Sequence, residues 1–169
     1  MTALATFEFS DRSVALRRAV AEDVPGIVEL LADDLLGATR DGPADGAGER
    51  DLQRYFQAFE AIDADSAHLL LVGEELGASG QLAATMQLSF IPGLARRGAL
   101  RAQIEAVRVH ADWRGSGLGR AVFGWAIDEA RRRGCELVQL TSDKQRGRAH
   151  RFYSELGFNA SHEGFKLVL

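Results

Sequence analysis

The spacing of apolar residues predicts short strands and two helices in the first half of the chain. Four stretches alternate or cluster apolar side chains between turn residues, as β-strands do: 13–18, 68–73, 81–91 and 100–110. Between the first two, helical spacing over 24–35 and again over 52–59 predicts two amphipathic helices. Gly, Ala and Asp dominate the intervening segment 37–48, which reads as a flexible loop. We therefore expect an antiparallel meander with two early helices.

The second half has a different period. Apolar positions over 118–133 follow helical spacing up to Gly134 and predict a helix. Three shorter segments follow: a strand at 136–141, a helix at 148–156 and a last strand at 165–169. A strand–helix–strand crossover places its two strands parallel, with a right-handed connection. The expected fold is an α/β domain with a mixed sheet and helices on both faces, formed by residues 1–169 as one domain.

Composition narrows the class of protein. The 169 residues are 46% hydrophobic and 26% charged, with only 3 Pro, which is typical of one compact soluble domain. No stretch approaches the roughly 20 apolar residues of a membrane span, and the first ten residues lack the pattern of a secretory signal. A lone Cys135 excludes an internal disulfide and reads as a core residue, and the 4 histidines lack metal-ligand spacing. We expect a cytoplasmic protein with no metal site and no membrane partner.

The net charge of −4 hides an asymmetry between the two halves. Residues 1–95 hold 6 Arg against 16 acidic residues, whereas residues 96–169 hold 14 basic against 8 acidic residues. Such a division suggests two partners of opposite charge, or one extended anion held by the basic half; two ordinary solvated surfaces are the alternative. Nucleic-acid binding gains support only from the run of arginines at 131–133, which also suits a solvated helix end.

The stretch 113–120, Trp-Arg-Gly-Ser-Gly-Leu-Gly-Arg, lies between a predicted strand and a predicted helix. Alternate glycines remove Cβ atoms, so backbone N–H groups can approach a ligand. The helix adds its own free N–H groups and the positive end of its dipole. These features predict a pyrophosphate site outside the carboxyl ends of the strands. The residues expected near the pyrophosphate are Arg114, Gly115, Gly117, Gly119 and Arg120.

Two familiar phosphate loops do not fit this stretch. A Walker A loop needs Gly-Lys-Ser/Thr, which occurs nowhere in the chain. The dinucleotide fingerprint needs a third glycine where Arg120 stands, and it belongs on the first strand of its fold. A tight turn with nothing bound is the plain structural alternative, and the flanking arginines and the helix start argue against it.

Three blocks of sequence, in order and spacing, resemble the GNAT superfamily of acyl-CoA-dependent N-acyltransferases. Residues 114–119, Arg-Gly-Ser-Gly-Leu-Gly, match its Arg/Gln-x-x-Gly-x-Gly/Ala signature. Residues 104–109, Ile-Glu-Ala-Val-Arg-Val, resemble the strand that precedes the signature. Residues 149–158, Ala-His-Arg-Phe-Tyr-Ser-Glu-Leu-Gly-Phe, resemble the family's Ala-x-x-Phe-Tyr-x-x-x-Gly-Phe helix ending. The specific part of the resemblance covers roughly residues 100–160.

The resemblance implies acetyl-CoA, or a related acyl-CoA, as the acyl donor. In the family, the strand before the signature pairs with the pantetheine arm through its backbone, and this role falls on Val107 and Val109. Many members place an asparagine shortly before the last helix, where this chain has Asp143 or Arg146, depending on the alignment. Family habit also suggests a homodimer.

Acyl transfer from a thioester to an amine needs a group that takes a proton from the ammonium ion. Glu105 is the candidate base: strict alternation puts it on one strand face with Val107 and Val109, where apolar surroundings tend to raise a carboxyl pKa. Many family members have a glutamate here that acts through a water. An ion pair with Arg101 or Arg108 is the structural alternative, and a bulge in the strand would change the face.

The departing thiolate and the oxyanion make two further demands. Tyr153 lies at the border of the apolar stripe of its helix and can present a hydroxyl to a cleft, and the family commonly uses a tyrosine here to protonate the thiolate. A packing role is the alternative for Tyr153. By analogy with the family, the N–H of Val109 would stabilise the oxyanion.

An N-acetyltransferase is the function that these features favour, by direct attack of the amine with a general base. The acidic first half suggests a cationic acceptor, an amine on a small molecule or a peptide. Its aromatic stripe of Tyr55, Phe56 and Phe59 suits the core more than a pocket. A non-catalytic acyl-CoA sensor and an unrelated nucleotide-binding module are the competing interpretations.

Overall fold

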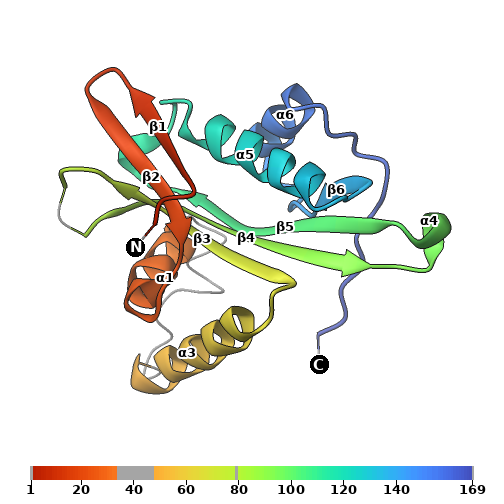
Figure 1. Ribbon diagram of the computed structural model, residues 1–169, viewed down its shortest axis with the longest axis horizontal. Helices are drawn as coiled ribbons and strands as arrows, with labels where there is room; N and C mark the ends of the chain where they lie inside the picture. Colours follow the sequence, from red (N-terminus) through yellow and green to blue (C-terminus); the bar gives the residue numbers. More distant parts are fainter. Residues whose placement is uncertain (1, 34–47, 79, 169) are drawn as a thin grey trace.

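The computed structural model describes residues 2–33, 48–78 and 80–168. These residues form one six-stranded sheet in the order β1-β2-β3-β4-β5-β6, which Figure 1 shows from one side. The strands are β1 (Ala5–Phe9), β2 (Arg12–Arg18), β3 (His68–Glu75), β4 (Leu82–Pro92), β5 (Leu100–Val109) and β6 (Leu137–Leu140). Neighbours from β1 to β5 are antiparallel, while β5 and β6 are parallel. The predicted meander and the parallel crossover are both confirmed.

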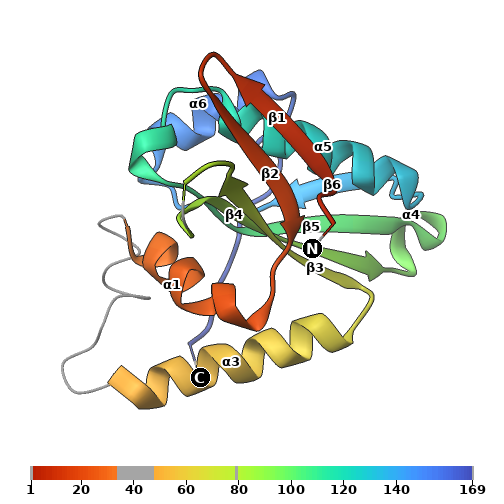
Figure 2. The same ribbon diagram turned by 60° about the vertical axis from the view of Figure 1, so that its left-hand side comes forward.

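Helices cover both faces of the sheet, as predicted. They are η1 (Ala21–Asp23), α1 (Val24–Ala32), α3 (Gly48–Ala64), α4 (Ala95–Gly98), η2 (Ala111–Trp113), α5 (Leu118–Arg132) and α6 (Gly147–Glu155). Figures 1 and 2 show α5 and α6 on one face and α1 and α3 on the other. The predicted loop 37–48 lies outside the described residues, except that Gly48 begins α3. Within the described ranges, no helix is long and apolar enough to cross a bilayer.

Each face of the sheet has its own apolar core. Under α5, the larger core contains the fully buried Leu71, Met86, Leu88 and Phe123. Under α1 and α3, a smaller core contains Ile27, Leu30, Phe59 and Val72, with Leu52, Tyr55 and Phe56 packed against it. The aromatic stripe of α3 is therefore part of the core, as its helical spacing indicates.

The two ends of α5 follow from glycines with positive φ. Gly117 is the N-cap residue at φ +94°, and Gly134, one residue beyond the C-cap, has φ +79°. Both values lie in the left-handed region, where glycine meets no Cβ clash. The predicted helix 118–133 is confirmed to within one residue.

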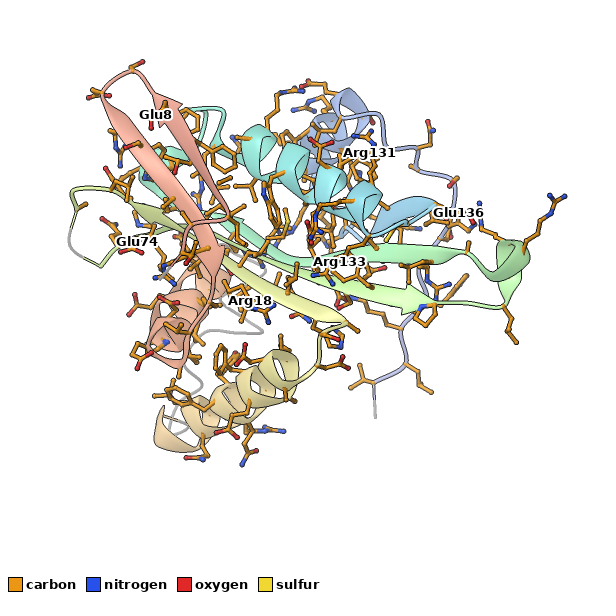
Figure 3. The ribbon with its side chains drawn as sticks, viewed as in Figure 1. Glu8, Arg18, Glu74, Arg131, Arg133 and Glu136 are labelled. Atoms are coloured by element: carbon orange, nitrogen blue, oxygen red, sulfur yellow. The ribbon has the colours of Figure 1, made fainter. Side chains whose placement is uncertain are left out.

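The three arginines at the end of α5 divide into two kinds. Arg131 and Arg132 have side chains more than 70% exposed. Arg133 turns toward the sheet, where its guanidinium stacks 4.1 Å from the centre of the Phe90 ring and donates a hydrogen bond to the Ser66 carbonyl. Figure 3 labels both Arg131 and Arg133. Burial acts to raise the pKa of Glu129, but hydrogen bonds from Arg132 and Arg133 outweigh it and lower that pKa. The end of α5 is thus fixed to the sheet and is more than a solvated surface.

The sheet differs from the sequence prediction at both edges. The apolar spacing does not predict β1, which pairs with β2 from Ala5↔Leu16 to Phe9↔Arg12. At the other edge, the predicted last strand 165–169 is wrong over its described part. Residues 159–168, which we call the tail, belong to no helix or strand and are all exposed. In Figure 1 the tail runs from the end of α6 past the sheet as a coil.

Candidate functional site

The parallel strands β5 and β6 pair over only part of their length. Their register runs from Arg101↔Leu137 to Ile104↔Leu140, where β6 ends, whereas β5 continues to Val109. Beyond Ile104, the side of β5 that faces β6 is therefore free of a strand partner among the described residues. We call this gap the β5–β6 opening. It gives β5 backbone groups access to a ligand that runs beside the strand.

A bulge in β5 changes the face on which Glu105 lies. Thr85 of β4 pairs with Arg108, and Gln87 pairs with Glu105. Two residues of β5, Ala106 and Val107, therefore stand opposite the single residue Met86 of β4. Ala106 has φ +52°, a left-handed value that is uncommon for a residue with a Cβ.

The extra residue reverses the alternation beyond it. Val107 and Val109 consequently pack on the α5 side with Ala102 and Ile104, while Glu105 lies on the opposite face and is exposed. The prediction that Glu105 shares a face with Val107 and Val109 is wrong, and so is the apolar environment expected for it.

Polar side chains surround Glu105 on its face of the sheet. His68, Ser89, Gln103 and Gln139 stand opposite one another across β3, β4, β5 and β6, and we call this set the polar row. Two hydrogen bonds join neighbours in it: His68 Nδ1 to Ser89 Oγ at 2.9 Å, and Gln139 Nε2 to Gln103 Oε1 at 2.7 Å. Glu105 lies beside this row, two residues from Gln103. The face can therefore take a hydrophilic molecule.

Tyr153 of α6 lies on the α5 side of the sheet, opposite the face that carries Glu105. Its ring packs against Phe123, Phe152 and Phe158, with centroids 5.7 to 6.3 Å away. Burial raises the pKa of the Tyr153 hydroxyl, and the charges of Arg146 and Arg108 partly oppose this shift. Val107 and Val109 of β5 pack against the same core as Tyr153. A phenol with a raised pKa keeps its proton at neutral pH.

The turn between β5 and α5, residues 113–120, has free backbone donors. Gly115 and Gly117 have φ +82° and +94°. In the described structure, the N–H groups of Gly115, Gly117, Gly119 and Arg120 donate to no backbone carbonyl, and the first such bond of α5 runs from Ala121 to Gly117. Free N–H groups at the start of a helix bind anions well. We call this segment the glycine turn.

The buried indole of Trp113 fixes the glycine turn to the N-terminal hairpin. Trp113 is 2% exposed, meets the Phe9 ring edge-on at 5.4 Å, and donates from Nε1 to Glu75. Arg12 lies 3.8 Å above the indole and binds the same carboxylate through two nitrogens. These hydrogen bonds from Arg12, ahead of the one from Trp113, hold the pKa of Glu75 below its usual value against the effect of burial.

The two arginines of the glycine turn make different contacts. Arg114 Nη2 lies 2.6 Å from Asp33 at the end of α1. Arg120 Nη2 lies 2.9 Å from Glu155 of α6, and both partners are more than half exposed. Arg114 therefore joins the turn to α1, while Arg120 can change partners at little cost.

The segment between β6 and α6 contributes a group that sequence reasoning missed. Ser142 Oγ is buried without a hydrogen-bond partner. An orphaned hydroxyl beside the opening suits an incoming polar ligand. No feature of the sequence distinguishes this serine from an ordinary loop residue. Asp143 accepts from the backbone N–H of Gln145 and, through its carbonyl, from that of Arg146, so it shapes the start of α6.

In the described ranges, neither a reactive cysteine nor a metal-binding group is found. Cys135 packs against the larger core, and burial raises the pKa of its thiol, consistent with a core residue. In that part of the chain, no group of three or more His, Cys, Asp or Glu side chains is arranged to hold a metal ion.

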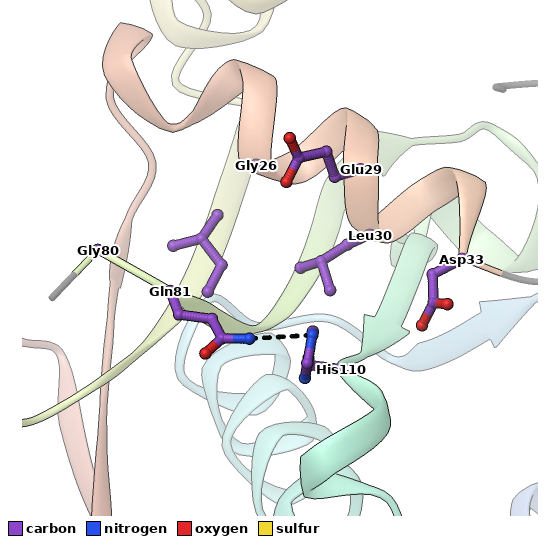
Figure 4. A pocket seen from close by; sticks show the side chains of 8 residues that line it. Gly26, Glu29, Leu30, Asp33, Gly80, Gln81 and His110 are labelled. Atoms are coloured by element: carbon purple, nitrogen blue, oxygen red, sulfur yellow. Dashed lines mark hydrogen bonds between the residues drawn. The ribbon is translucent and has the colours of Figure 1, made fainter. Parts of the chain in front are cut away.

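A cavity of about 290 Å³ lies between α1 and the far end of β5 (Figure 4). Its lining includes Glu29, Asp33, Gln81 and His110. The His110 Nε2 and Gln81 Nε2 atoms are 3.0 Å apart and joined by a hydrogen bond. Along an extended strand, His110 is roughly 15 Å from Glu105. The cavity is therefore close to the glycine turn and away from the candidate base.

This combination of a mixed sheet with a parallel opening and a glycine-rich anion turn is the architecture of an acetyltransferase. The model of the acetyltransferase (GNAT) family matches residues 28–158, and the chain belongs to that family. Enzymes of this family take the acetyl group from acetyl-CoA. The resemblance noted in the sequence is confirmed, and the chain is an acyl-CoA-dependent N-acetyltransferase.

Two relatives of this chain are named as N-acetyltransferases, in agreement with this assignment, whereas one similar solved structure carries a different description. The chain is 28% identical to the aminoalkylphosphonate N-acetyltransferase of Salmonella typhimurium, over 91% of this chain and 90% of that one. It is 33% identical to glucosamine 6-phosphate N-acetyltransferase 1 of Oryza sativa subsp. japonica, over 69% of this chain and 67% of that one. A solved structure described as a transcriptional regulator from Bacillus halodurans is 40% identical, with a TM-score of 0.82, over 92% of this chain and 99% of that one.

Proposed function

We propose that this chain transfers an acetyl group from acetyl-CoA to the primary amine of a small molecule. Direct attack of the amine, with Glu105 as general base and Tyr153 as general acid, is the mechanism. The observation that carries the proposal is the set of unbonded N–H groups in the glycine turn, which follows directly on the strand that lines the β5–β6 opening. The whole of residues 1–169 acts as one domain.

The donor side of the site fits a coenzyme that combines a diphosphate with an extended arm. The N–H groups of Gly115, Gly117 and Gly119 would hold the diphosphate, with Arg114 and Arg120 as flanking charges. Val107 and Val109 would offer backbone groups to the pantetheine arm. Bound acetyl-CoA supplies the activated thioester. Ser142 Oγ, which is buried without a hydrogen-bond partner, would bind a polar atom of the coenzyme.

Glu105 receives the proton that the amine must lose. A protonated alkylamine has no lone pair for attack, so a carboxylate within reach of it, directly or through one water, is required. Glu105 is exposed on the face opposite Val107 and Val109. The amine therefore approaches from the face of the polar row while the coenzyme lies on the other, and the two meet in the opening.

Tyr153 supplies a proton to the departing thiolate. Its burial and raised pKa keep the hydroxyl neutral, so that a proton is available at neutral pH. The N–H of Val109 would stabilise the negative charge on the carbonyl oxygen. In place of the asparagine that many relatives use, Asp143 or Arg146 would approach the pantetheine arm.

The acceptor is a small amine whose ammonium group is attracted to the acidic half of the chain. Glu105 is exposed on the face of the sheet opposite the larger core. Farther along β5, Glu29 and Asp33 line the cavity beside α1, and Asp33 also binds Arg114. Two relatives are named for acceptors that join an amine to a phosphonate or a phosphate, aminoalkylphosphonate and glucosamine 6-phosphate. Amines of these two kinds belong at the head of a substrate panel that also contains polyamines and carboxylate-rich amines.

Replacing Glu105 tests the mechanism. With the best acceptor of the panel, we expect Glu105→Gln to lower kcat about 10²- to 10⁴-fold at neutral pH, because the base is lost. A colorimetric assay of released thiol measures turnover. Calorimetry should show acetyl-CoA binding unchanged, since Glu105 faces away from the coenzyme. Glu136→Gln, which removes an exposed carboxylate just before β6, is the matched control.

Four results would contradict the proposal. Failure of acetyl-CoA to bind would remove the donor, and tight binding without turnover of any amine would favour an acyl-CoA sensor. Full activity in Glu105→Gln would assign the base to another group. Preference for carboxylate-rich amines would contradict attraction of a cationic acceptor.

A further inference from the structure

An ion pair between two N-terminal strands holds the start of the glycine turn. Arg12 of β2 binds the Glu75 carboxylate of β3 through Nε at 2.7 Å and through Nη2 at 2.6 Å. Trp113 donates from Nε1 to the same carboxylate at 3.1 Å, and the Arg12 guanidinium lies over its ring. Arg12 Nη1 also donates to the Asp112 carbonyl at 3.3 Å. We call Arg12, Glu75 and Trp113 the anchor cluster.

Short contacts connect the anchor cluster to the start of α5. The Trp113 carbonyl accepts a hydrogen bond from Ser116 Oγ at 2.7 Å, and Ser116 Oγ accepts one from the N–H of Leu118, the first residue of α5. Phe9 of β1 packs against the Trp113 ring and lies 3.8 Å from the point where a Cβ would stand on Gly117. A shift of the indole would therefore move the groups that orient the glycine turn.

The partial burial of the anchor cluster makes its hydrogen bonds costly to lose. Trp113 is 2% exposed, and the side chains of Glu75 and Arg12 are 14% and 33% exposed. A buried donor that loses its partner costs more free energy than the same loss in water. The planar guanidinium and the two carboxylate oxygens also fix each other's orientation. Without the carboxylate, both the indole N–H and the guanidinium would lose the group that holds them.

We propose that Arg12 and Glu75 are positioning residues for the coenzyme, which hold the glycine turn through Trp113 in the conformation that binds a diphosphate. Neither side chain needs to touch acetyl-CoA. The pair removes conformational freedom that the turn would otherwise lose on binding, so it strengthens binding without adding a contact. This inference rests on the proposed function, because it takes the glycine turn as the diphosphate site.

The same two strands contain a matched ion pair. Glu74, the residue before Glu75 in β3, accepts from Arg17 Nε of β2 at 2.7 Å. Because side chains alternate along a strand, this pair lies on the opposite face of the sheet, where Arg17 also binds Asp23 of η1. Glu74→Ala and Glu75→Ala thus remove the same group from adjacent residues, and only the second belongs to the anchor cluster.

Calorimetry with acetyl-CoA on the full chain tests the positioning role. We expect Glu75→Ala to raise Kd about tenfold, as the loss of a partner for a buried donor would, and Glu74→Ala to leave Kd unchanged. With the best acceptor of the panel, KM for acetyl-CoA should rise with Kd in Glu75→Ala, while kcat at saturating acetyl-CoA should stay at the wild-type value. A merely structural role would lower the stability of both variants without this split between KM and kcat.

Two further variants keep the test decisive. Glu75→Gln retains an oxygen for Trp113 Nε1 and should recover most of the affinity that Glu75→Ala loses. Arg12→Ala leaves the bond between Trp113 and Glu75 in place and should raise Kd about two- to fivefold, as expected for the more exposed partner of an ion pair. Far-ultraviolet circular dichroism shows which variants are folded, and Arg12→Ala decides the matter if Glu75→Ala is not.

The outcomes separate this inference from the proposed function. Equal Kd values in Glu75→Ala and Glu74→Ala, or wild-type affinity in Arg12→Ala, would overturn the positioning role and leave the diphosphate site intact. A loss of kcat at unchanged Kd in Glu75→Ala would overturn it too. Failure of the wild-type protein to bind acetyl-CoA would overturn both proposals together.

Discussion

The two faces of the central sheet are built in different ways. On the side of α5 and α6, the features assigned to the donor come largely from one short stretch, the glycine turn, whose free N–H groups are close in sequence. On the side of α1 and α3, the polar row takes its four members from β3, β4, β5 and β6. A site formed by consecutive residues can be recognised in sequence, whereas one assembled across strands depends on register.

The two faces also differ in what surrounds the proposed general base and general acid. Tyr153 lies among aromatic rings, and its hydroxyl is desolvated enough to shift its pKa. Glu105 is exposed beside amide and hydroxyl side chains. If the two sides bind donor and acceptor as proposed, the apolar side would position one coenzyme, and the polar side would set acceptor specificity through a few polar contacts.

Removing the Tyr153 hydroxyl should produce the largest effect on the donor side. For Tyr153→Phe we expect kcat to fall about 10- to 100-fold, near the low end for a general acid because a thiolate leaves fairly well unaided. Thiol-release kinetics measure this, and Tyr55→Phe in the smaller core is the control. Unchanged kcat in Tyr153→Phe would reduce Tyr153 to a packing residue.

The same variant should change the alkaline behaviour. Burial raises the folded-state pKa of Tyr153 above the ordinary value. Its contribution to stability is therefore present below the ordinary pKa of about 10 and is lost as pH rises through the raised pKa. Wild-type kcat should fall over the same range, and Tyr153→Phe should lack both changes. A shared alkaline limb in the two proteins would contradict the assignment.

A methyl group at Gly117 tests the rigid geometry of the glycine turn. At φ +94°, Gly117→Ala should cost about 1–2 kcal/mol and weaken acetyl-CoA binding about tenfold, as calorimetry can measure. Gly124→Ala, within α5 and with open space at its Cβ, should instead stabilise by about 0.5–1 kcal/mol. Equal effects at the two positions would show that the turn needs no special backbone.

The smallest effect concerns Arg120. If its charge serves the coenzyme, Arg120→Ala should raise KM for acetyl-CoA about two- to fivefold, as expected for one exposed charge contact. Glu155→Ala releases Arg120 from its ion pair and should leave KM equal or lower. Steady-state kinetics at low and high salt decide between them. A parallel rise of KM in both variants would make the ion pair itself the relevant contact.

Local signals account for most of what the sequence predicts correctly. Helical spacing and Gly134 identify α5, alternation and turn residues identify the β3–β4 hairpin, and the crossover rule makes β5 and β6 parallel. The glycine turn is likewise visible in sequence, because Gly115 and Gly117 adopt left-handed backbone conformations that other residues avoid.

The features that the sequence does not reveal depend on tertiary structure. Ala106 is left-handed without the glycine that would announce it, so the face of Glu105 could not be read from alternation. The tail has the pattern of a strand, but whether it pairs depends on which edge is within reach. The orphaned Ser142 becomes noticeable only when burial and hydrogen bonds are known.

Because side chains alternate along β5 and Ala106 adds one residue to it, the face that carries Glu105 depends on whether the number of residues before it changes by an odd or an even number. Inserting or deleting one residue between Leu100 and Glu105 would move the carboxylate to the α5 side of the sheet, where we propose that the coenzyme binds, and inserting or deleting two residues would return it. Related proteins should therefore differ in this segment by insertions or deletions of two residues. An engineered graft of a different acceptor pocket must keep the extra bulge residue, Ala106, in place.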